Sequence, residues 1–414
     1  MLRHVRLYRA LRVAIALTRV LPRYVLLALR ANASQESWDR VHRLAAEQIR
    51  QLALDLAGAF TKAAQIGGAR ADILPEAFID ILSQFHDAVP PRPFETLRPV
   101  VERDLGRPLE ELFEKVDEQA LAAASLAQVH RARLKDGSDV VIKIQYPEVR
   151  RIIPLDLSML RFVVAIVRII QRRIDLRSVV GEVTRFIELE VDFGREVDAT
   201  ERLGAILASD PEVQVPKVHR ELCGDNVIVL EYLDGIQVTR SVELVAAGHK
   251  LAEVARKIGA LYGSMIFELG FFHGDPHPGN LLVLPDGRIG LLDFGLCKDL
   301  PDGFARLVAE MMISAMIGDA ESSLAAAEKL GFDTRAIRPE HLRSLMLMMI
   351  GDSDSDEGLL EILGESSIRK IPEDFALVIR TLVLLNGLSH RLAPNRRLIQ
   401  AELIQHLAVG AAQD

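Results

Sequence analysis

The amino-acid sequence predicts an α+β fold, because the spacing of its hydrophobic residues changes from helical to strand-like and back along the chain. Before residue 115 and after residue 304, apolar residues recur at steps of three and four, which is typical of amphipathic helices. Between these regions, residues 128–133 and 139–145 have the pattern of two strands joined by the tight turn Lys135-Asp136-Gly137. A mixed central region flanked by helical regions is therefore expected.

The same spacing predicts the other elements and divides the chain into three parts. Further strands are expected at Val227–Glu231, at Leu281–Leu284 and in the segment that runs into Leu291-Leu292, and helices are expected at 38–114, at 153–203, beyond Gly259 and from Phe304 to the end. The predicted parts are an N-terminal helical extension at 1–115, a strand-containing part with a helical insertion at 116–236, and a mostly helical part at 237–414.

Composition excludes several classes of protein. The chain has 414 residues, of which 49% are hydrophobic and 26% charged, so it is long enough to bury a large core and is not disordered or fibrous. A net charge of −8 and the lack of a basic run with aromatic residues argue against nucleic acid as a partner. The two cysteines, Cys223 and Cys297, are far apart in the sequence, so we expect no disulfide, no zinc site and a reducing compartment.

The N-terminal 30 residues form a basic amphipathic pattern. Seven arginines alternate with apolar residues there, which indicates either a helix on an anionic membrane surface or an ordinary helix that packs on the protein with its arginines in solvent. Arginine recurs through the apolar stretch, so a secretory signal is not expected. Elsewhere, Arg161, Arg168 and Arg380 interrupt the longest apolar runs before they reach about 18 residues, so membrane contact is expected to be peripheral.

The segment from His273 to Gly295 contains the most informative motif. It contains His-Gly-Asp-Pro-His-Pro-Gly-Asn, then a predicted hairpin, then Asp-Phe-Gly, in the order and spacing of the catalytic loop and metal-binding segment of kinases. Phosphoryl transfer needs oxygen ligands for magnesium and a group beside the attacking hydroxyl or water. We assign the metal ligands to Asn280 and Asp293 and the catalytic position to Asp275.

A lysine inside a predicted strand provides the second part of this site. Lys143 lies in Val-Ile-Lys-Ile, where an unpaired ammonium would be costly to bury, so it needs an anionic partner. In kinases this lysine contacts nucleotide phosphates and a helix glutamate. The following helical segment offers Glu188, Asp192 and Glu196 at four-residue steps, and we assign the partner to Glu196. Alternatively, Arg185 and Arg195 neutralise these carboxylates.

These residues resemble the UbiB/AarF family of atypical kinases, the ADCK type, from about Leu52 to the end of the chain. Its K-x-G-Q signature is similar to Lys62-Ala63-Ala64-Gln65, its alanine-rich loop to Ala122-Ala123-Ala124-Ser125, and its E-x-D signature to Glu190-Val191-Asp192. Two alanines depart from the family pattern, since Ala64 and Ala127 stand where members have glycine.

The resemblance implies an atypical protein-kinase-like bilobal fold that binds ATP or ADP with Mg²⁺. It implies that the alanine loop lies over the phosphates, that Glu231 and Leu233 present backbone groups to adenine, and that Lys62 and Gln65 lie near Glu190 and Asp192 over the active site. Large substrates would then be blocked, which favours ATP hydrolysis over protein phosphorylation. The family is linked to isoprenoid quinone biosynthesis and lipid homeostasis, so the expected partners include a quinone precursor or other lipid and an anionic membrane surface. We expect a cytoplasmic protein, peripheral at the inner face of the membrane.

Two other functions remain open from the sequence. The His-Gly-Asp and His-Pro-Gly-Asn segments also resemble the catalytic loop of aminoglycoside and choline kinases, which would make the protein a small-molecule phosphotransferase. Those kinases lack the helix with lysine and glutamine and the alanine loop. The third possibility is a nucleotide-binding pseudokinase that acts as a scaffold, although all five predicted machinery residues are present.

Overall fold

The chain forms two compact units in a computed structural model that describes residues 2–30, 34–68, 74–82, 90–170, 176–334, 342, 372–394 and 397–413. The first unit contains Met1–Phe193 and His219–Val229, and the second contains Gly194–Val218 and Leu230–Asp414. Part of the helical region predicted from Phe304 onward, at 335–341 and 343–371, lies outside the described residues. The predicted division of the chain at residues 115 and 236 stays a prediction.

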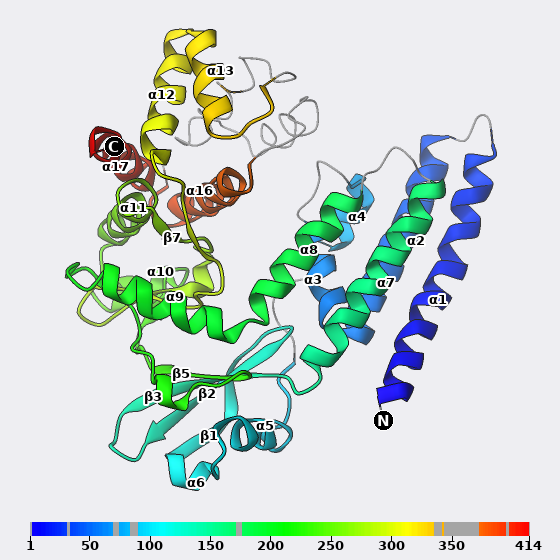
Figure 1. The fold of residues 1–414 in the computed structure, drawn as a ribbon, viewed down its shortest axis with the longest axis horizontal. Helices are drawn as coiled ribbons and strands as arrows, with labels where there is room; N and C mark the ends of the chain where they lie inside the picture. The colour runs from blue at the N-terminus through cyan, green and yellow to red at the C-terminus, as the bar shows by residue number, and fades with distance from the viewer. Residues whose placement is uncertain are drawn as a thin grey trace. The chain divides into compact units, whose positions relative to one another are not determined.

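The first unit combines a layer of helices with an antiparallel sheet (Figure 1). Its helices are α1 (Leu2–Ala28), α2 (Gln35–Leu56), α3 (Ala59–Gly68), α4 (Glu76–Leu82), α5 (Arg98–Leu105), α6 (Leu109–Leu112), α7 (Val149–Ile170) and α8 (Leu176–Glu190). Its sheet has the strand order β1-β2-β3-β5, with β1 at Phe113–Ala123, β2 at Ala127–Leu134, β3 at Asp139–Gln145 and β5 at Val227–Glu231. Buried apolar residues of the sheet, of α5 and of α7 form one core cluster.

The second unit is mostly helical, with two small sheets. Its helices are α9 (Phe193–Ile206), α10 (Ser241–Ala246), α11 (Leu251–Phe267), α12 (Phe304–Ile317), α13 (Ala320–Lys329), α16 (Glu373–Leu392) and α17 (Leu398–Gln413). One sheet has the order β4-β9-β8-β6, with β4 at Val213–Gln214, β6 at Ile236–Gln237, β8 at Leu281–Val283 and β9 at Ile289–Leu291. The other pairs β7 (Phe271–His273) with β10 (Cys297–Asp299). The α11, α16 and α17 helices share one large buried core with both sheets.

The predicted hairpins are confirmed, and their pairing explains why the sequence pattern found them. The β2 and β3 strands pair antiparallel with His130 opposite Ile142, and β8 and β9 pair with Leu282 opposite Gly290. Gly137 has φ 90°, a backbone conformation that glycine adopts at little energetic cost, so it closes the first turn. The α+β class predicted from the sequence is therefore confirmed.

Two element boundaries were predicted wrongly. The helical pattern is predicted to about residue 114 and α6 ends at Leu112, but the strand β1 that begins at Phe113 is not predicted; it is an edge strand with three register shifts, so its apolar residues do not alternate. The single helix predicted to carry Glu188, Asp192 and Glu196 is also broken, because α8 ends at Glu190 and α9 begins at Phe193. At this break the Val191 carbonyl accepts a hydrogen bond from the Gln145 side chain, 3.1 Å away. Glu188 and Glu196 therefore lie on two different helices.

One helix of the second unit, α16, is long and apolar enough to cross a membrane by length and composition alone. The apolar stretch of this helix lies within Asp374–Leu392, and half of it is buried in the protein. Val378, Leu382, Leu385 and Leu388 belong to the large core of this unit. The packing of this helix accounts for its apolar composition.

A buried ion pair fixes the N-terminal helix to the first unit. The Arg9 Nε donates to Asp156 Oδ1 at 2.7 Å, a second guanidinium nitrogen contacts the other carboxylate oxygen, and a third donates to the Leu56 carbonyl at 2.8 Å. The Asp156 side chain is fully buried, and burial raises its pKa to about 6 although the Arg9 guanidinium lowers it. Asp156 also accepts a hydrogen bond from the backbone of Ala59, the first residue of α3. Residues of α1, α2, α3 and α7 therefore meet at one buried charge pair.

We predict that Arg9→Ala destabilises the protein by about 3–5 kcal/mol at pH 7.5, because it leaves a buried carboxylate without its cation. The pKa of Asp156 in the folded state lies above its ordinary value, so folding favours the protonated carboxyl group. The stability that this protonated form contributes is lost as the pH rises through the folded-state pKa. The difference in melting temperature between variant and parent should therefore be larger at pH 7.5 than at pH 5. Arg43→Ala, which removes an exposed ion pair on α2, is the control. An equal deficit at both pH values would contradict the assignment.

Candidate active site

A buried histidine joins the predicted catalytic loop to the predicted metal-binding segment. The His273 Nε2 lies 2.7 Å from the Asp293 carbonyl and 3.1 Å from the Leu292 carbonyl, and its Nδ1 lies 3.0 Å from the Tyr262 hydroxyl. A carbonyl can only accept, so Nε2 carries the proton and Nδ1 accepts from Tyr262. Burial raises the pKa of Tyr262 well above its ordinary value, so this hydroxyl keeps its proton. The two segments are thus held together by hydrogen bonds from a buried histidine.

Asp275, the predicted catalytic residue, is held on both sides of its carboxylate. The Asn280 Nδ2 donates to Asp275 Oδ2 at 3.1 Å and to the Asp275 carbonyl at 3.2 Å. Arg380, on α16, donates to Asp275 Oδ1 at 3.2 Å. The next residue, Thr381, donates its hydroxyl to the Gly274 carbonyl at 3.1 Å. The loop that carries Asp275 is therefore anchored to α16.

Gly274 has a steric reason to be glycine. A Cβ at this position would lie 2.6 Å from the Leu296 carbonyl oxygen, closer than real Cβ atoms come to such an atom. The Gly274 N–H donates to the same carbonyl at 3.0 Å. The residue before Asp275 therefore permits the close approach of the catalytic loop to the chain that follows Asp-Phe-Gly.

Asp293 has an uncommon backbone conformation. Its φ is 57°, in the left-handed region that residues other than glycine adopt infrequently. Asp293 Oδ1 accepts from the Gly295 N–H at 3.3 Å, and the preceding residue, Leu292, donates its N–H to the Asn280 carbonyl at 2.9 Å. Backbone strain of this kind is concentrated at functional sites, where the surroundings hold it in place. The conformation supports a functional role for Asp293.

The donors present fit magnesium. Mg²⁺ in nucleotide sites takes one or two protein oxygen ligands and completes its shell with phosphates and water. Asp293 provides a carboxylate, and Asn280 turns its amide nitrogen toward Asp275, which leaves its amide oxygen as the atom suited to a cation. These two residues would hold the ion, whose charge would offset that of the phosphates.

The strand lysine lies in the first unit. Lys143 is half-buried on β3, with its ammonium 5.6 Å from the centre of the Phe193 ring. Its predicted partner, Glu196, is buried on α9 in the second unit, and the pairing of these two residues stays a prediction. Arg195, beside Glu196, donates to the carbonyls of Gly295 and Cys297, each at 2.7 Å. The start of α9 is thereby fixed to the segment after Asp-Phe-Gly.

The four residues predicted to cover the phosphates lie at the end of β1 and in the turn that leads to β2. Ala122 and Ala123 end β1, and the Ala124 N–H donates to the Ala127 carbonyl at 2.9 Å. Ala122 and Ala124 are exposed, whereas the Ser125 side chain is buried. A hairpin between the first two strands is where kinases place their glycine-rich loop. Nucleotide contact by these residues stays a prediction.

The predicted adenine-binding residues follow β5. Glu231 ends this strand, and its carboxylate accepts from the Gln214 side chain and the Lys217 N–H, both at 3.0 Å. Leu233 is buried against Leu282 and Leu284 of the second unit. The Glu231 side chain is thus occupied by contacts within the protein. Recognition of adenine at Glu231 and Leu233 would therefore use their backbone groups.

The lysine signature of α3 contacts the acidic signature of α8. Lys62 Nζ lies 2.7 Å from Glu190 Oε2, with both side chains about one-quarter exposed. Asp192 lies just after α8, in the break before α9, and Gln65 lies one turn after Lys62 on α3. Ala64, which departs from the family glycine, is fully buried in a cluster with alanines of α2. The predicted contact between Lys62 and Glu190 is present, while the regulatory roles of these four residues stay predictions.

Several residues that hold this site are not identified by any sequence pattern. Arg380, Thr381 and Tyr262 were not predicted, and His273 was noted only as part of the motif. Arg380 was read only as an interruption of an apolar run, yet an arginine inside such a run is itself a sign of a buried anionic partner. Its partner Asp275 lies 105 residues away, so no local pattern identifies it.

Comparison with known protein families agrees with this geometry. The model of the ABC1 atypical kinase-like domain matches residues 84–327, more than half of the chain. The chain belongs to this family. The expected family resemblance and kinase-like fold are therefore confirmed, and the protein has the general character of an atypical kinase.

Relatives and one solved structure point to the same family. The chain is 32% identical over 370 residues to the protein ACTIVITY OF BC1 COMPLEX KINASE 1, chloroplastic, of Arabidopsis thaliana, covering 86% of this chain and 54% of that one. It is 33% identical to AarF domain-containing protein kinase 1 of Gallus gallus, covering 77% and 63%. The chain thus spans about half to two-thirds of these relatives. The structure of the Rv3197–erythromycin complex from Mycobacterium tuberculosis matches 87% of this chain and 98% of that one, with a TM-score of 0.56 and 25% identity.

We predict that Lys62 and Glu190 stabilise each other in a double-mutant cycle. Lys62→Ala and Glu190→Ala should each destabilise the protein, and the cycle should give a coupling of about 0.5–1 kcal/mol, as expected for a partly buried pair. Urea unfolding of the parent, the two single variants and the double variant measures it. Lys250 and Glu253, an exposed pair on one helix, provide the control and should show weaker coupling. Additive effects at Lys62 and Glu190 would show that their contact has no energetic role.

Proposed function

We propose that the protein binds ATP or ADP with Mg²⁺ and catalyses transfer of the γ-phosphoryl group, mainly to water. The observation that carries this proposal is the joined arrangement of Asp275, Asn280 and Asp293 in the second unit. The Asn280 side chain donates to the Asp275 carboxylate, and the Asn280 backbone carbonyl accepts from the Leu292 N–H. The His273 ring is hydrogen-bonded to the backbone carbonyl of Asp293. A base position and two metal ligands are therefore held by one hydrogen-bonded network.

Each residue has a defined task in this proposal. Asp275 would orient the attacking water or hydroxyl and accept its proton. Asn280 and Asp293 would hold the ion that offsets charge on the phosphates. Arg380 would keep the Asp275 carboxylate in place. In the first unit, Lys143 would contact the phosphates, with Glu196 as its partner.

Hydrolysis is proposed over protein phosphorylation because of the contact between Lys62 and Glu190. This ion pair holds α3 to α8, and α3 also packs through Ala64 on α2, so the lysine signature belongs to a firmly packed group of helices. A helix held in this way would restrict the access of large substrates, as the family resemblance implies. Lys62, Gln65, Glu190 and Asp192 are proposed to regulate turnover.

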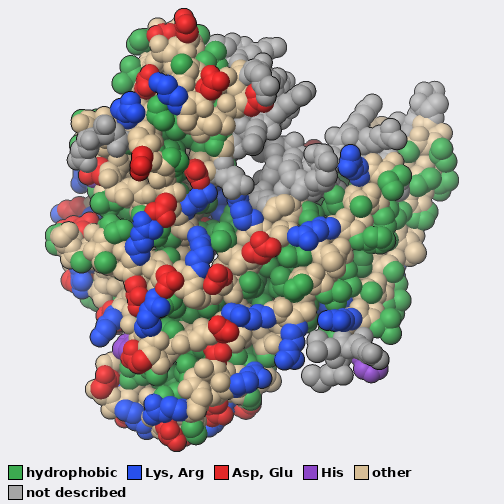
Figure 2. Space-filling view, viewed as in Figure 1, with side chains coloured by type: hydrophobic (Ala, Val, Ile, Leu, Met, Phe, Trp, Pro, Cys, Tyr) green, Lys and Arg blue, Asp and Glu red, His purple; other side chains and the backbone are tan. Residues whose placement is uncertain are grey.

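The proposed cellular role is support of isoprenoid quinone biosynthesis or lipid homeostasis at a membrane surface. We place the protein in the cytoplasm, peripheral at the inner face of the membrane. The exposed side of α1 supports this placement: Leu7, Leu11, Leu26 and Leu29 are each more than half exposed, beside arginines such as Arg6 and Arg23. Figure 2 shows hydrophobic side chains gathered over this part of the first unit. A quinone precursor or another lipid is the proposed partner.

We predict that Mg-ATP or Mg-ADP raises the melting temperature by a few degrees, because a ligand that binds only the folded state stabilises it by RT ln(1 + [L]/Kd). Asp293→Asn should abolish most of the magnesium-dependent part of this shift, since an amide is a poorer ligand than a carboxylate. Asp302→Asn, an exposed position nearby in the sequence, is the control. Thermal shift with nucleotide, with and without magnesium, is the measurement. No shift in the parent at millimolar nucleotide would refute the proposed function.

A further prediction concerns α1 at a membrane. Replacing Leu7 and Leu11 by serine should weaken co-sedimentation with phosphatidylglycerol vesicles, because both side chains are exposed on the helix. Binding of the parent should weaken with salt, since each arginine near an anionic surface contributes about 1 kcal/mol. Leu121→Ser, at an exposed position of β1, should have no effect. These point variants preserve the buried Arg9, which deletion of the helix would remove. Unchanged binding would exclude this surface.

A further inference from the structure

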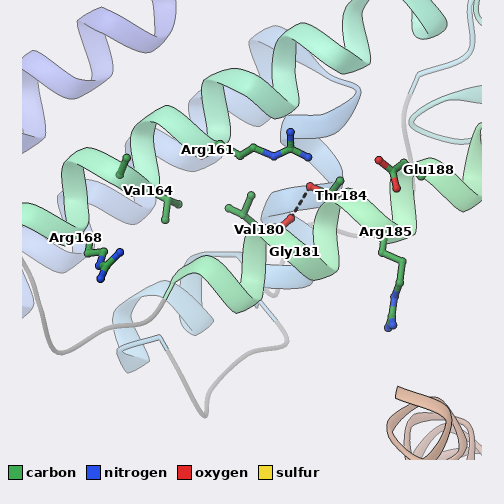
Figure 3. A pocket seen from close by; sticks show the side chains of 9 residues that line it. Arg161, Val164, Arg168, Val180, Gly181, Thr184, Arg185 and Glu188 are labelled. Carbon is green, nitrogen blue, oxygen red and sulfur yellow. Dashed lines mark hydrogen bonds between the residues drawn. The ribbon is translucent and has the colours of Figure 1, made fainter. Parts of the chain in front are cut away.

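A groove between α7 and α8 lies entirely within the first unit and has no role in the proposed chemistry. Its volume is about 570 Å³, and Figure 3 shows the two helices that border it. Arg161, Val164, Ala165 and Arg168 line it from α7, and Val180, Gly181, Thr184, Arg185 and Glu188 line it from α8. The groove is open to solvent along these two helices.

Small residues keep the groove open. A Cβ added at Gly181 would meet no described atom within 4 Å, so no described side chain fills the space above this residue. Ala165 faces it from α7. The Thr184 hydroxyl donates to the Val180 carbonyl at 2.7 Å, as Figure 3 shows, and its hydrogen is therefore directed into its own helix. The floor of the groove is thus mainly apolar.

The rim of the groove is basic, although the chain as a whole carries a net charge of −8. Three arginines and one glutamate line it. Arg161 and Arg168 lie seven residues apart on α7, about 10 Å along the helix axis. Neither forms an ion pair with any residue in the described part of the chain. Figure 3 shows Arg161 extending toward α8.

An apolar floor with a basic rim fits a ligand that is both anionic and apolar. Pockets of several hundred cubic ångströms, lined by apolar side chains with a few charged groups, are typical of small-molecule sites. Guanidinium groups pair well with carboxylate and phosphate oxygens. The groove also adjoins exposed apolar residues of α7, Phe162 at 60% and Ile169 at 77% exposure, which would extend the apolar contact along an acyl chain.

We propose that the α7–α8 groove binds a single anionic amphiphile, with a carboxylate or phosphate headgroup at the arginines of the rim and a hydrocarbon chain over Val164, Ala165 and Val180. This site does not depend on nucleotide binding by the second unit. The groove also differs from the exposed side of α1. The groove would hold one molecule, whereas the exposed side of α1 would lie against a bilayer.

The test is saturable binding of the fluorescent fatty acid cis-parinaric acid, below its critical micelle concentration, to the full chain. Gly181→Leu should weaken binding at least tenfold, because the new side chain enters the groove without a steric clash. Gly387→Leu is the matched control, since Gly387 is also an exposed helical glycine whose Cβ would meet nothing within 4 Å. It should bind like the parent.

The charge requirement is tested separately. The double variant Arg161→Gln and Arg168→Gln should weaken binding about tenfold and reduce its dependence on salt. Arg151→Gln, an exposed position on the same helix, is the control. Circular dichroism confirms that each variant is folded. Equal binding by Gly181→Leu and the parent, or by the double arginine variant and the parent, would overturn the proposal.

The source of the amphiphile is distinguished by two further probes. If phosphatidylglycerol vesicles displace parinaric acid from the parent and inorganic phosphate does not displace it, a lipid is the ligand. Displacement by inorganic phosphate alone at low millimolar concentration would show a simple anion site and overturn the requirement for a chain. The proposal would also be overturned if the parent and Gly181→Leu bound vesicles equally and neither bound parinaric acid saturably.

Discussion

The hydrogen bond from His273 to the Asp293 carbonyl is the contact on which the candidate active site depends. It joins two segments that are separated by a hairpin, and the His273 imidazole is buried, so leaving this ring nitrogen unpaired would cost about 1–3 kcal/mol. Tyr262 fixes the tautomer from the other side of the ring. Asp275 and Asp293 can therefore act as one site, because their backbones are not free to move apart.

A second buried polar contact organises the first unit. Arg9 and Asp156 join α1 to α7, and the same two side chains bond the end of α2 and the start of α3. Between those helices Ala57 and Gly58 both have positive φ, at 52° and 57°, so the turn is sharp and fixed. The helix that presents Lys62 to Glu190 begins at this turn. The start of this helix is thus fixed by the charge pair of Arg9 and Asp156.

The first unit also presents two surfaces with different chemistry on neighbouring helices. The exposed side of α1 carries leucines and arginines in a broad face, whereas α7 and α8 enclose a defined groove with a basic rim. Because α1 packs on α7 through Leu17 and Val163 near the buried Val13, both surfaces belong to one packed group of helices. A lipid-facing role for the unit would therefore combine a flat apolar contact with a specific binding groove.

The sequence by itself determined those features that are encoded over short distances. The β2–β3 hairpin and the site motifs with His-Gly-Asp and Asp-Phe-Gly are predicted from the sequence, because turn residues, strand alternation and motif spacing are local properties. The contact between Lys62 and Glu190 is expected only from the family resemblance, since these residues are far apart in the chain. Tertiary structure alone decided that Arg380 holds Asp275, that Arg9 is buried against Asp156, and that α8 ends before Asp192. Arg9 and Asp156 are 147 residues apart, and an arginine in an amphipathic helix has the same local pattern whether it faces solvent or a buried carboxylate. Only packing, which determines which side of each helix is removed from water, distinguishes the two.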